Sequence, residues 1–180
     1  MKKTILFLSL ITLTTAVMAQ KVSTTSAVIS FDASTAKDAL PKAGNKTVIA
    51  SLDKTSGVLM FEAAVNNFSF SNPMMQDHFN SATWMNSATF PKFTFSGKIV
   101  KLSEVKFKKD GTYKIKVKGD LTIKGITRSV SIPATIVVKK AVVTASANFT
   151  IRLADYGISA QPVESGKVSR EPKISVSATF

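Results

Sequence analysis

The stretch YKIKVKGDLTIKGITR, residues 113–128, alternates apolar and polar side chains. Its apolar residues are Tyr113, Ile115, Val117, Leu121 and Ile123. A period of two residues is that of a β-strand, whose successive side chains point to opposite faces. One face of this strand is therefore dry, while the lysines on the other face make it basic and solvated.

Similar patterns recur along the chain and predict an all-β fold. Turn signals such as Asp53–Gly57, Lys108–Gly111 and Lys124-Gly125 separate several of the expected strands. Short strands with close turns favour an antiparallel meander that closes as a barrel or folds as a sandwich. Closure would pair the last strand with an early one and remove the sheet edges. The eight expected strands are Ser26–Asp32, Thr47–Asp53, Val58–Val65, Lys92–Lys101, Tyr113–Ile123, Arg128–Lys139, Val142–Leu153 and Lys173–Phe180.

The third expected strand contains an irregularity. Leu59, Phe61, Ala63 and Val65 share one parity, whereas Phe68 and Phe70 take the other. A bulge or turn near Asn66-Asn67 would return both phenylalanines to the same face.

Residues 71–90 break the β pattern and predict a short helical segment. Ser71-Asn72-Pro73 is typical of a helix cap with proline in the first turn, and Met75 and Phe79 share one helical face. A connection this long often covers an opening or a site. The sequence leaves open whether the segment plugs one end of the barrel or covers a site there, and it can do both.

The N-terminus is typical of a secretory signal peptide. Lys2 and Lys3 precede the mostly apolar stretch Ile5–Val17, and Val17-Met18-Ala19 predicts cleavage before Gln20. Residues 1–19 are therefore expected to be removed, leaving one domain over residues 20–180 in the periplasm or secreted. The chain has no cysteine, so the exported domain must rely on burial and strand pairing.

The formal net charge is +13, and the predicted mature chain keeps +11, since 22 basic and 11 acidic residues remain. Basic charge is carried by 21 lysines and three arginines. Arginine is favoured for bidentate contacts to phosphates and bases, whereas lysine suits a solvated face. The composition therefore argues against nucleic acid as a partner and favours a loose peripheral contact with anionic membranes. It does not specify an oligomeric state.

No catalytic apparatus is evident, and we expect a protein that is not an enzyme. The single histidine, His78, follows Asp77 without an evident nucleophile, and the SxxK match at Ser51–Lys54 lacks its helical setting. The acidic residues are scattered, with no spacing that would gather carboxylates around a metal. No catalytic residue, metal site or cofactor is predicted.

The remaining signal is apolar. The chain has twelve phenylalanines and six methionines, which supply apolar surface without hydrogen-bond demands. An eight-stranded barrel can be filled by its own side chains or can hold one slender ligand. Small residues on inward parities favour some room in the interior: Ala63, Gly97, Gly119, Ala145 and Ala147.

Five segments, in order, resemble the YceI-like family of exported bacterial proteins. SLDKTSGVLMF at residues 51–61 is similar to the family's early hairpin, and DHF…WM at residues 77–85 to its Asp/His segment. FPKFTF at residues 90–95 is similar to a strand start, GDLTIKGIT at residues 119–127 to a hairpin, and IRLADYGI at residues 151–158 to a strand end. The resemblance covers nearly all of the mature chain.

The resemblance implies an eight-stranded antiparallel, lipocalin-like β-barrel with a short helical segment near the mouth. It also implies binding of a long apolar chain, such as a polyisoprenoid or fatty amide, inside the barrel. Together with the alternation, it predicts a lining of Phe61, Val65, Phe68, Phe70, Phe93, Phe95, Val117, Leu121, Phe149 and Ile151. The mouth would be closed by Met74, Met75, Phe79, Trp84 and Met85.

Two alternatives remain. The terminal Phe180 after an alternating strand also suits a small outer-membrane barrel, although aromatic girdles are missing. A filled barrel without a ligand, serving as a structural or stress-related module, is the other alternative.

Overall fold

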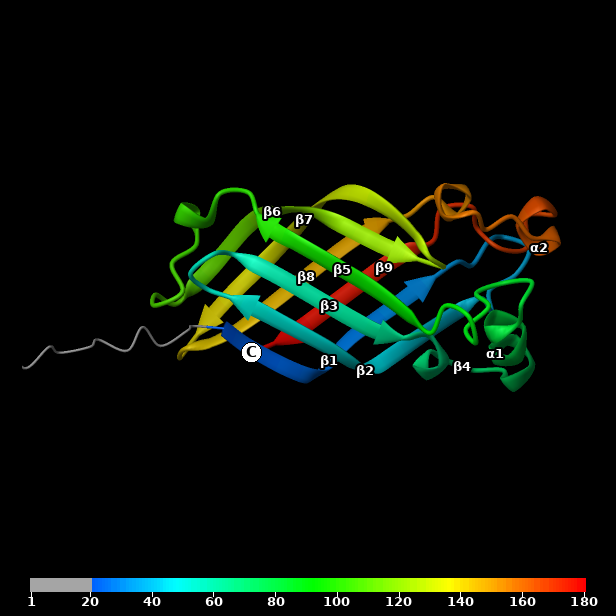
Figure 1. Cartoon of the computed structure of the whole chain (residues 1–180), viewed down its shortest axis with the longest axis horizontal. Coiled ribbons are helices and arrows are strands. Elements are labelled where there is room, and N and C mark those ends of the chain that lie inside the picture. Colours follow the sequence, from blue (N-terminus) through cyan, green and yellow to red (C-terminus); the bar gives the residue numbers. More distant parts are fainter. Residues whose placement is uncertain (1–20) are drawn as a thin grey trace, which may run out of the picture.

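A computed structural model describes residues 21–180 and contains a closed antiparallel barrel of eight strands (Figure 1). The strand order around the barrel is β1-β9-β8-β7-β6-β5-β3-β2, and β2 pairs back with β1. A two-residue strand, β4 (Ser69–Phe70), adds to β2. The barrel strands are β1 (Lys21–Asp32), β2 (Lys42–Asp53), β3 (Val58–Ala64), β5 (Lys92–Ile99), β6 (Gly111–Ile123), β7 (Ile126–Lys139), β8 (Val142–Thr150) and β9 (Lys173–Thr179).

The eight strands predicted from alternation are all present. Because the sheet closes on itself, the predicted barrel is confirmed and the β-sandwich is excluded. The main difference is length: β1 begins at Lys21 and β2 at Lys42, both five residues before the expected starts. The additional residues at the start of each strand pair with the end of the other strand. Lys21 lies opposite Asp53, and Lys42 lies opposite Asp32. Pairing rather than alternation therefore defines them. The predicted signal peptide, residues 1–19, lies outside the described residues.

The irregularity after the third strand is a single 3₁₀ turn, η1 (Val65–Asn67), between β3 and β4. Asn45 of β2 is fully buried beneath it. Its side-chain Nδ2 donates to the Ala64 carbonyl at 3.0 Å, and its Oδ1 accepts from the Thr47 backbone N–H at 2.8 Å. The turn restores the inward parity, so that Phe68 lies in the interior as predicted.

Two tight hairpins connect β6 to β7 and β7 to β8. Lys124 and Gly125 have φ of 50° and 74° between β6 and β7, and Lys140 and Ala141 have φ of 49° and 68° between β7 and β8. Two consecutive residues with positive φ give the turn twist that matches the flanking strands. Glycine adopts this conformation freely, but Ala141 does so against the repulsion of its Cβ.

A glycine pair brings β5 and β6 unusually close together. Gly97 lies directly opposite Gly119. A Cβ added at Gly119 would stand only 2.3 Å from the Gly97 Cα, and one added at Gly97 would meet the Phe95 ring at 2.4 Å. The ring of Phe95 therefore takes the space that a side chain at position 97 would occupy. At this pair, the small residues accommodate an aromatic ring rather than leave open room.

The two α-helices lie at the same end of the barrel (Figure 1). α1 (Pro73–Asn80) begins as predicted, with Asn72 as N-cap accepting from the Met74 N–H at 2.9 Å and Pro73 in the first turn. α2 (Gln161–Glu164) lies in the long connection between β8 and β9, after the 3₁₀ turn η3 (Leu153–Tyr156). Among residues 21–180, no helix is long and apolar enough to cross a membrane.

The opposite end of the barrel is closed by apolar packing. A buried cluster there includes Leu52, Ile99, Val105 and Val143, with Phe107 packed against it. Val105 and Phe107 come from the connection between β5 and β6, which contains the 3₁₀ turn η2 (Leu102–Glu104). Together they form a dry plug, so the barrel is a cup with its open side at the helical end.

Candidate functional site

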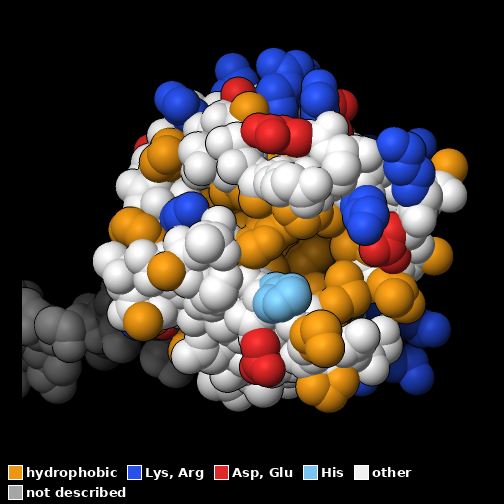
Figure 2. Space-filling model, turned by 90° about the vertical axis from the view of Figure 1, so that its right-hand side faces the viewer, with side chains coloured by type: hydrophobic (Ala, Val, Ile, Leu, Met, Phe, Trp, Pro, Cys, Tyr) orange, Lys and Arg blue, Asp and Glu red, His pale blue; other side chains and the backbone are white. Residues whose placement is uncertain are grey.

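The barrel contains an elongated apolar cavity of about 440 Å³. Figure 2, viewed onto the helical end, shows its mouth as a hollow walled by hydrophobic side chains, with the histidine at the rim. Every barrel strand except β2 contributes to the wall. The volume lies within the range of about 300–1,000 Å³ typical of small-molecule sites.

The floor of the cavity rests on the plug. Leu59, Val117 and Ala145 face the cavity and also belong to the buried cluster at the closed end. Above them, Ala134 of β7 lies opposite Ala147 of β8, which lies opposite Val176 of β9. All three line the cavity, and the two alanines leave space that larger side chains would fill.

Phenylalanines form the wall nearest to α1. Phe79 of α1 has ring centroids at 5.6 Å from Phe31, 5.9 Å from Phe68 and 5.1 Å from Phe70. Phe68 also approaches Phe93 at 5.8 Å. The Phe31–Phe79 pair is stacked and the other three are tilted, with centroid distances in the range favoured for aromatic pairs. Through Phe79, this cluster attaches α1 to the barrel wall.

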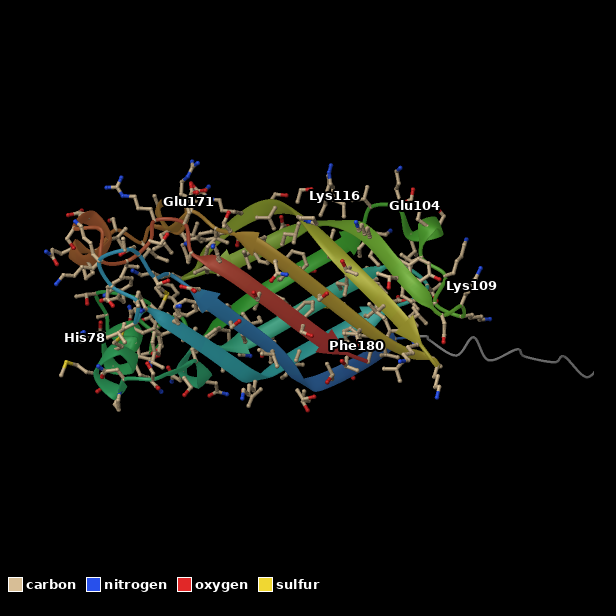
Figure 3. All side chains as sticks on the ribbon, turned by 180° about the vertical axis from the view of Figure 1, so that it is seen from behind. His78, Glu104, Lys109, Lys116, Glu171 and Phe180 are labelled. Atoms are coloured by element: carbon tan, nitrogen blue, oxygen red, sulfur yellow. The ribbon has the colours of Figure 1, made fainter. Side chains whose placement is uncertain are left out.

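Polar groups are confined largely to the rim. Asp38, Asn72, His78 and Lys167 border the cavity near the mouth, and Figure 3 shows His78 at the helical end of the molecule. His78 is exposed. A predominantly apolar interior with charges of both signs at its entrance can hold an apolar chain and contact a polar end group.

The rim opposite α1 is tied together by hydrogen bonds. The connection between β1 and β2 contacts the segment that follows α2, because the Thr35 hydroxyl donates to the Gly166 carbonyl at 2.9 Å. The Lys37 ammonium donates to the Ser165 carbonyl at 2.8 Å. These two long connections therefore form one side of the mouth, and α1 forms the other.

Thirteen of the fifteen predicted site residues lie on the cavity wall. Their contact with a ligand stays a prediction. They are Phe61, Phe68, Phe70, Met75, Phe79, Trp84, Met85, Phe93, Phe95, Val117, Leu121, Phe149 and Ile151.

The other two predicted residues lie elsewhere. Val65 shares the inward parity of its strand, but it is the first residue of η1 and is fully buried in a cluster with Met85 and Tyr156. Met74 is 65% exposed, because it occupies the outer face of α1 while Met75 and Phe79 occupy the inner one. Met74 therefore does not close the mouth.

Sequence reasoning missed the contribution of the first and last strands. Ile29 and Phe31 of β1, and Ile174 and Val176 of β9, all line the cavity. Their alternation with polar neighbours was a usable signal. Asp38 and Leu40, in the connection between β1 and β2, and Pro162, in the four-residue α2, also line it. No periodicity in these short segments indicates which side chains face inward.

Two groups near the mouth, Asp32 and Tyr156, have shifted pKa values. The Ser34 hydroxyl and backbone N–H donate to the Asp32 carboxylate, which with nearby Lys42 lowers the pKa of Asp32 to about 2. Burial raises the pKa of the Tyr156 phenol. Asp32 is thus ionised and Tyr156 neutral at pH 7. Within residues 21–180, no three His, Cys, Asp or Glu side chains are grouped to hold a metal ion.

Comparison with solved structures agrees with the barrel. The Burkholderia cenocepacia protein BcnA is 19% identical with a TM-score of 0.70, over 86% of this chain and 96% of that one. A polyisoprenoid binding domain from Saccharophagus degradans, implicated in plant cell wall breakdown, is 12% identical with a TM-score of 0.75, over 89% and 97%. The Campylobacter jejuni YCEI protein is 19% identical with a TM-score of 0.53, over 74% and 80%. At these identities the likeness establishes the fold.

The sequence itself matches the model of one protein family, described as the YceI-like domain, over residues 10–180. No curated protein matches the chain. The match covers the whole barrel and both helical segments at its mouth, which confirms the family predicted from the five sequence segments. The chain therefore belongs to the YceI-like domain family.

Proposed function

We propose that this protein is an exported carrier that holds one long apolar chain, a polyisoprenoid or another lipid, inside its barrel. The observation that carries the proposal is the continuous apolar cavity of about 440 Å³, closed at one end and open at the other. A deep, narrow cup suits a chain-like molecule better than a compact one. The polyisoprenoid binding domain from Saccharophagus degradans, which has the same fold, supports this ligand class.

Binding would be driven by removal of the chain's apolar surface from water. Each Å² buried contributes about 25 cal/mol, against which the loss of translational and rotational freedom must be set. Within the barrel the ligand would meet mainly Phe, Ile, Leu, Val and Ala side chains. A polar end group would remain at the rim, near Asp38, His78 and Lys167.

The role is one of binding rather than catalysis. The titratable groups that line the cavity, Asp38, His78 and Lys167, lie at its rim, and the barrel walls are almost entirely apolar, which suits binding. Export to the periplasm or the exterior follows from the signal peptide predicted at residues 1–19.

The first test is native mass spectrometry of residues 20–180 purified without detergent, followed by organic extraction. We expect one apolar molecule per chain, and the extract identifies it. A ligand-free protein that also rejects added polyprenols would contradict the proposal and favour a barrel without a ligand.

A matched pair of variants localises the ligand. Ala147→Trp places an indole in the cavity and is expected to abolish the co-purified molecule while keeping the β-sheet circular dichroism spectrum. Thr150→Trp adds the same ring to an exposed position of the same strand and should leave the ligand in place. Equal retention of ligand in both variants would place the site outside the cavity.

The outer-membrane alternative makes a different prediction about extraction. Lys114, Lys116 and Lys118 are all exposed on the outer face of β6, where a membrane barrel needs apolar side chains. We expect the protein to leave cells by osmotic shock without detergent. A requirement for detergent would instead support an outer-membrane barrel.

A further inference from the structure

Positive charge is concentrated on the closed end of the barrel and on the adjoining outer face of β5 and β6, away from the rim of the mouth. Residues 98–118 contain eight lysines and two acidic residues, a net charge of 8 − 2 = +6. Lys139 and Lys140 adjoin them, since the Lys140 N–H donates to the Asp110 carboxylate at 2.9 Å. All ten lysines are exposed, and together they are called the basic face. In Figure 3, Lys109 lies at the end opposite His78, and Lys116 points outward from the side of the barrel between the two ends.

The clustered lysines of the basic face lower the stability of the fold. Lys98 of β5 lies directly opposite Lys118 of β6, and Lys116 follows on the same outer face. Like charges paired across strands are destabilising. Within the described part of the chain, a single lysine of this face has an ion pair, that of Lys101 with Glu104 at 3.2 Å. Internal contacts therefore leave most of this charge uncompensated.

Apolar side chains are interspersed with these lysines. Val100 is 49% exposed, and its N–H donates to the Lys116 carbonyl at 2.9 Å. Val142 is 47% exposed and lies opposite Lys139 across β7 and β8. Val137, at 37%, is on the same outer surface. A surface that combines lysines with exposed aliphatic groups fits a partner that is anionic at its surface and apolar just beneath.

The residue types decide which polyanion fits. The basic face contains no arginine, since Arg128, Arg152 and Arg170 all lie outside it. Its two aromatic residues, Phe107 and Tyr113, pack against the buried cluster instead of offering rings to bases. Nucleic-acid surfaces rely on arginine forks and exposed aromatic rings, whereas lysine point charges suffice for anionic head groups.

We propose that the basic face docks the protein onto a bilayer surface rich in anionic lipids, with its mouth directed away from that bilayer. None of the ten lysines lines the cavity, so docking and cargo binding are separate properties of the molecule. In this orientation the mouth remains accessible to whatever donates or receives the cargo, while the closed end holds the protein at the surface.

The test is co-sedimentation of residues 20–180 with vesicles of mixed phosphatidylcholine and phosphatidylglycerol. We expect binding at an ionic strength of about 0.15 M that weakens as salt is added, because the Debye length shortens. Vesicles of phosphatidylcholine alone should bind little. Failure to bind the anionic vesicles would overturn the proposal whatever the cavity holds.

Two variants with the same change in net charge separate a specific face from general basicity. The first replaces Lys98, Lys114, Lys116 and Lys118 with Gln and should weaken binding to anionic vesicles by at least about ten-fold. The control replaces Lys46, Lys124, Arg170 and Lys173 with Gln, all outside the basic face, and should retain most binding. Equal losses would show that net charge alone acts and would overturn the proposal.

The same variants distinguish a failure of membrane docking from a failure of ligand binding. The four-lysine variant should still yield its apolar molecule on organic extraction, because its cavity is unchanged. A third measurement uses duplex DNA as competitor: displacement of the protein from vesicles at equal phosphate concentration would favour a nucleic-acid partner and reject the lipid surface.

Discussion

Single polar residues hold the barrel where strand pairing is interrupted. Asn45 is the clearest case, since it is a fully buried amide between β2 and the turn that follows β3. Its side chain supplies the partner that the Ala64 carbonyl and the Thr47 N–H would otherwise lack. Buried polar groups left without partners cost about 1–3 kcal/mol each.

We therefore expect Asn45→Ala to lower the free energy of unfolding by about 2–3 kcal/mol. Urea denaturation followed by circular dichroism measures this. Lys46→Ala, at the exposed neighbouring position, serves as the control and should change the value by less than about 0.5 kcal/mol. Equal effects of the two substitutions would show that the amide is not needed to stabilise the turn.

At the scale of elements, the mouth is built from connections rather than strands. None of the residues of α1 is fully buried, and the helix is attached to the barrel through Phe79 in the aromatic cluster. The segment between β4 and β5 therefore both packs against the wall and borders the opening. Residues 71–90 therefore do both things that the sequence left open. Met85 is buried and helps to plug the end of the barrel, whereas α1 forms the accessible rim of the opening.

Phe79→Ala should release α1 from the wall. Loss of three ring contacts is expected to cost about 2 kcal/mol, less than a fully buried phenylalanine. Hydrogen exchange of residues 73–80 should accelerate more than that of the barrel strands. Met74→Ala on the exposed side of the same helix is the control, and similar exchange in both variants would contradict the role of Phe79.

The β7–β8 hairpin has an unfavourable residue at its turn. Ala141 has φ of 68°, a conformation that glycine adopts without steric cost. Ala141→Gly is expected to raise the free energy of unfolding by about 0.5–1 kcal/mol. Thermal denaturation measures the gain. Ala134→Gly inside β7 should instead lower stability, and a loss at both sites would show that the strain at position 141 is negligible.

At the scale of the whole molecule, stability depends on closing the sheet. β9 pairs on one side with β8 and on the other with β1, so it joins the two ends of the meander. Without it, both neighbouring strands would expose unpaired backbone groups, which promote aggregation. The cavity also depends on closure, because Ile174 and Val176 form part of its wall.

Truncation after Pro172 is therefore expected to yield aggregated or unfolded protein. Size-exclusion chromatography and circular dichroism of the refolded chain measure this. Ser175→Thr with Ser177→Thr keeps both outward hydroxyls and should remain monodisperse. A soluble, β-rich truncated chain would show that seven barrel strands suffice.

Much of the fold could be predicted from local patterns. Alternation identified all eight strands, and the positions of Phe93, Phe95, Phe149 and Ile151 on the cavity wall follow from parity alone. The helix start at Asn72-Pro73 follows from capping chemistry. Missed site residues fall into two groups: Phe31 had a readable parity, whereas Leu40 lies in a connection that local sequence does not orient.

The sequence by itself determined the strands, their inward faces, the polar cap of α1 and the family, because these depend on neighbours a few residues apart. Only the tertiary structure decided that the barrel encloses a cavity with a closed end and an open one. It also decided that the Phe95 ring fills the space above Gly97, and that ten exposed lysines gather on the closed end and on the adjoining outer face of β5 and β6. These features depend on contacts between residues distant in sequence, which no local periodicity encodes.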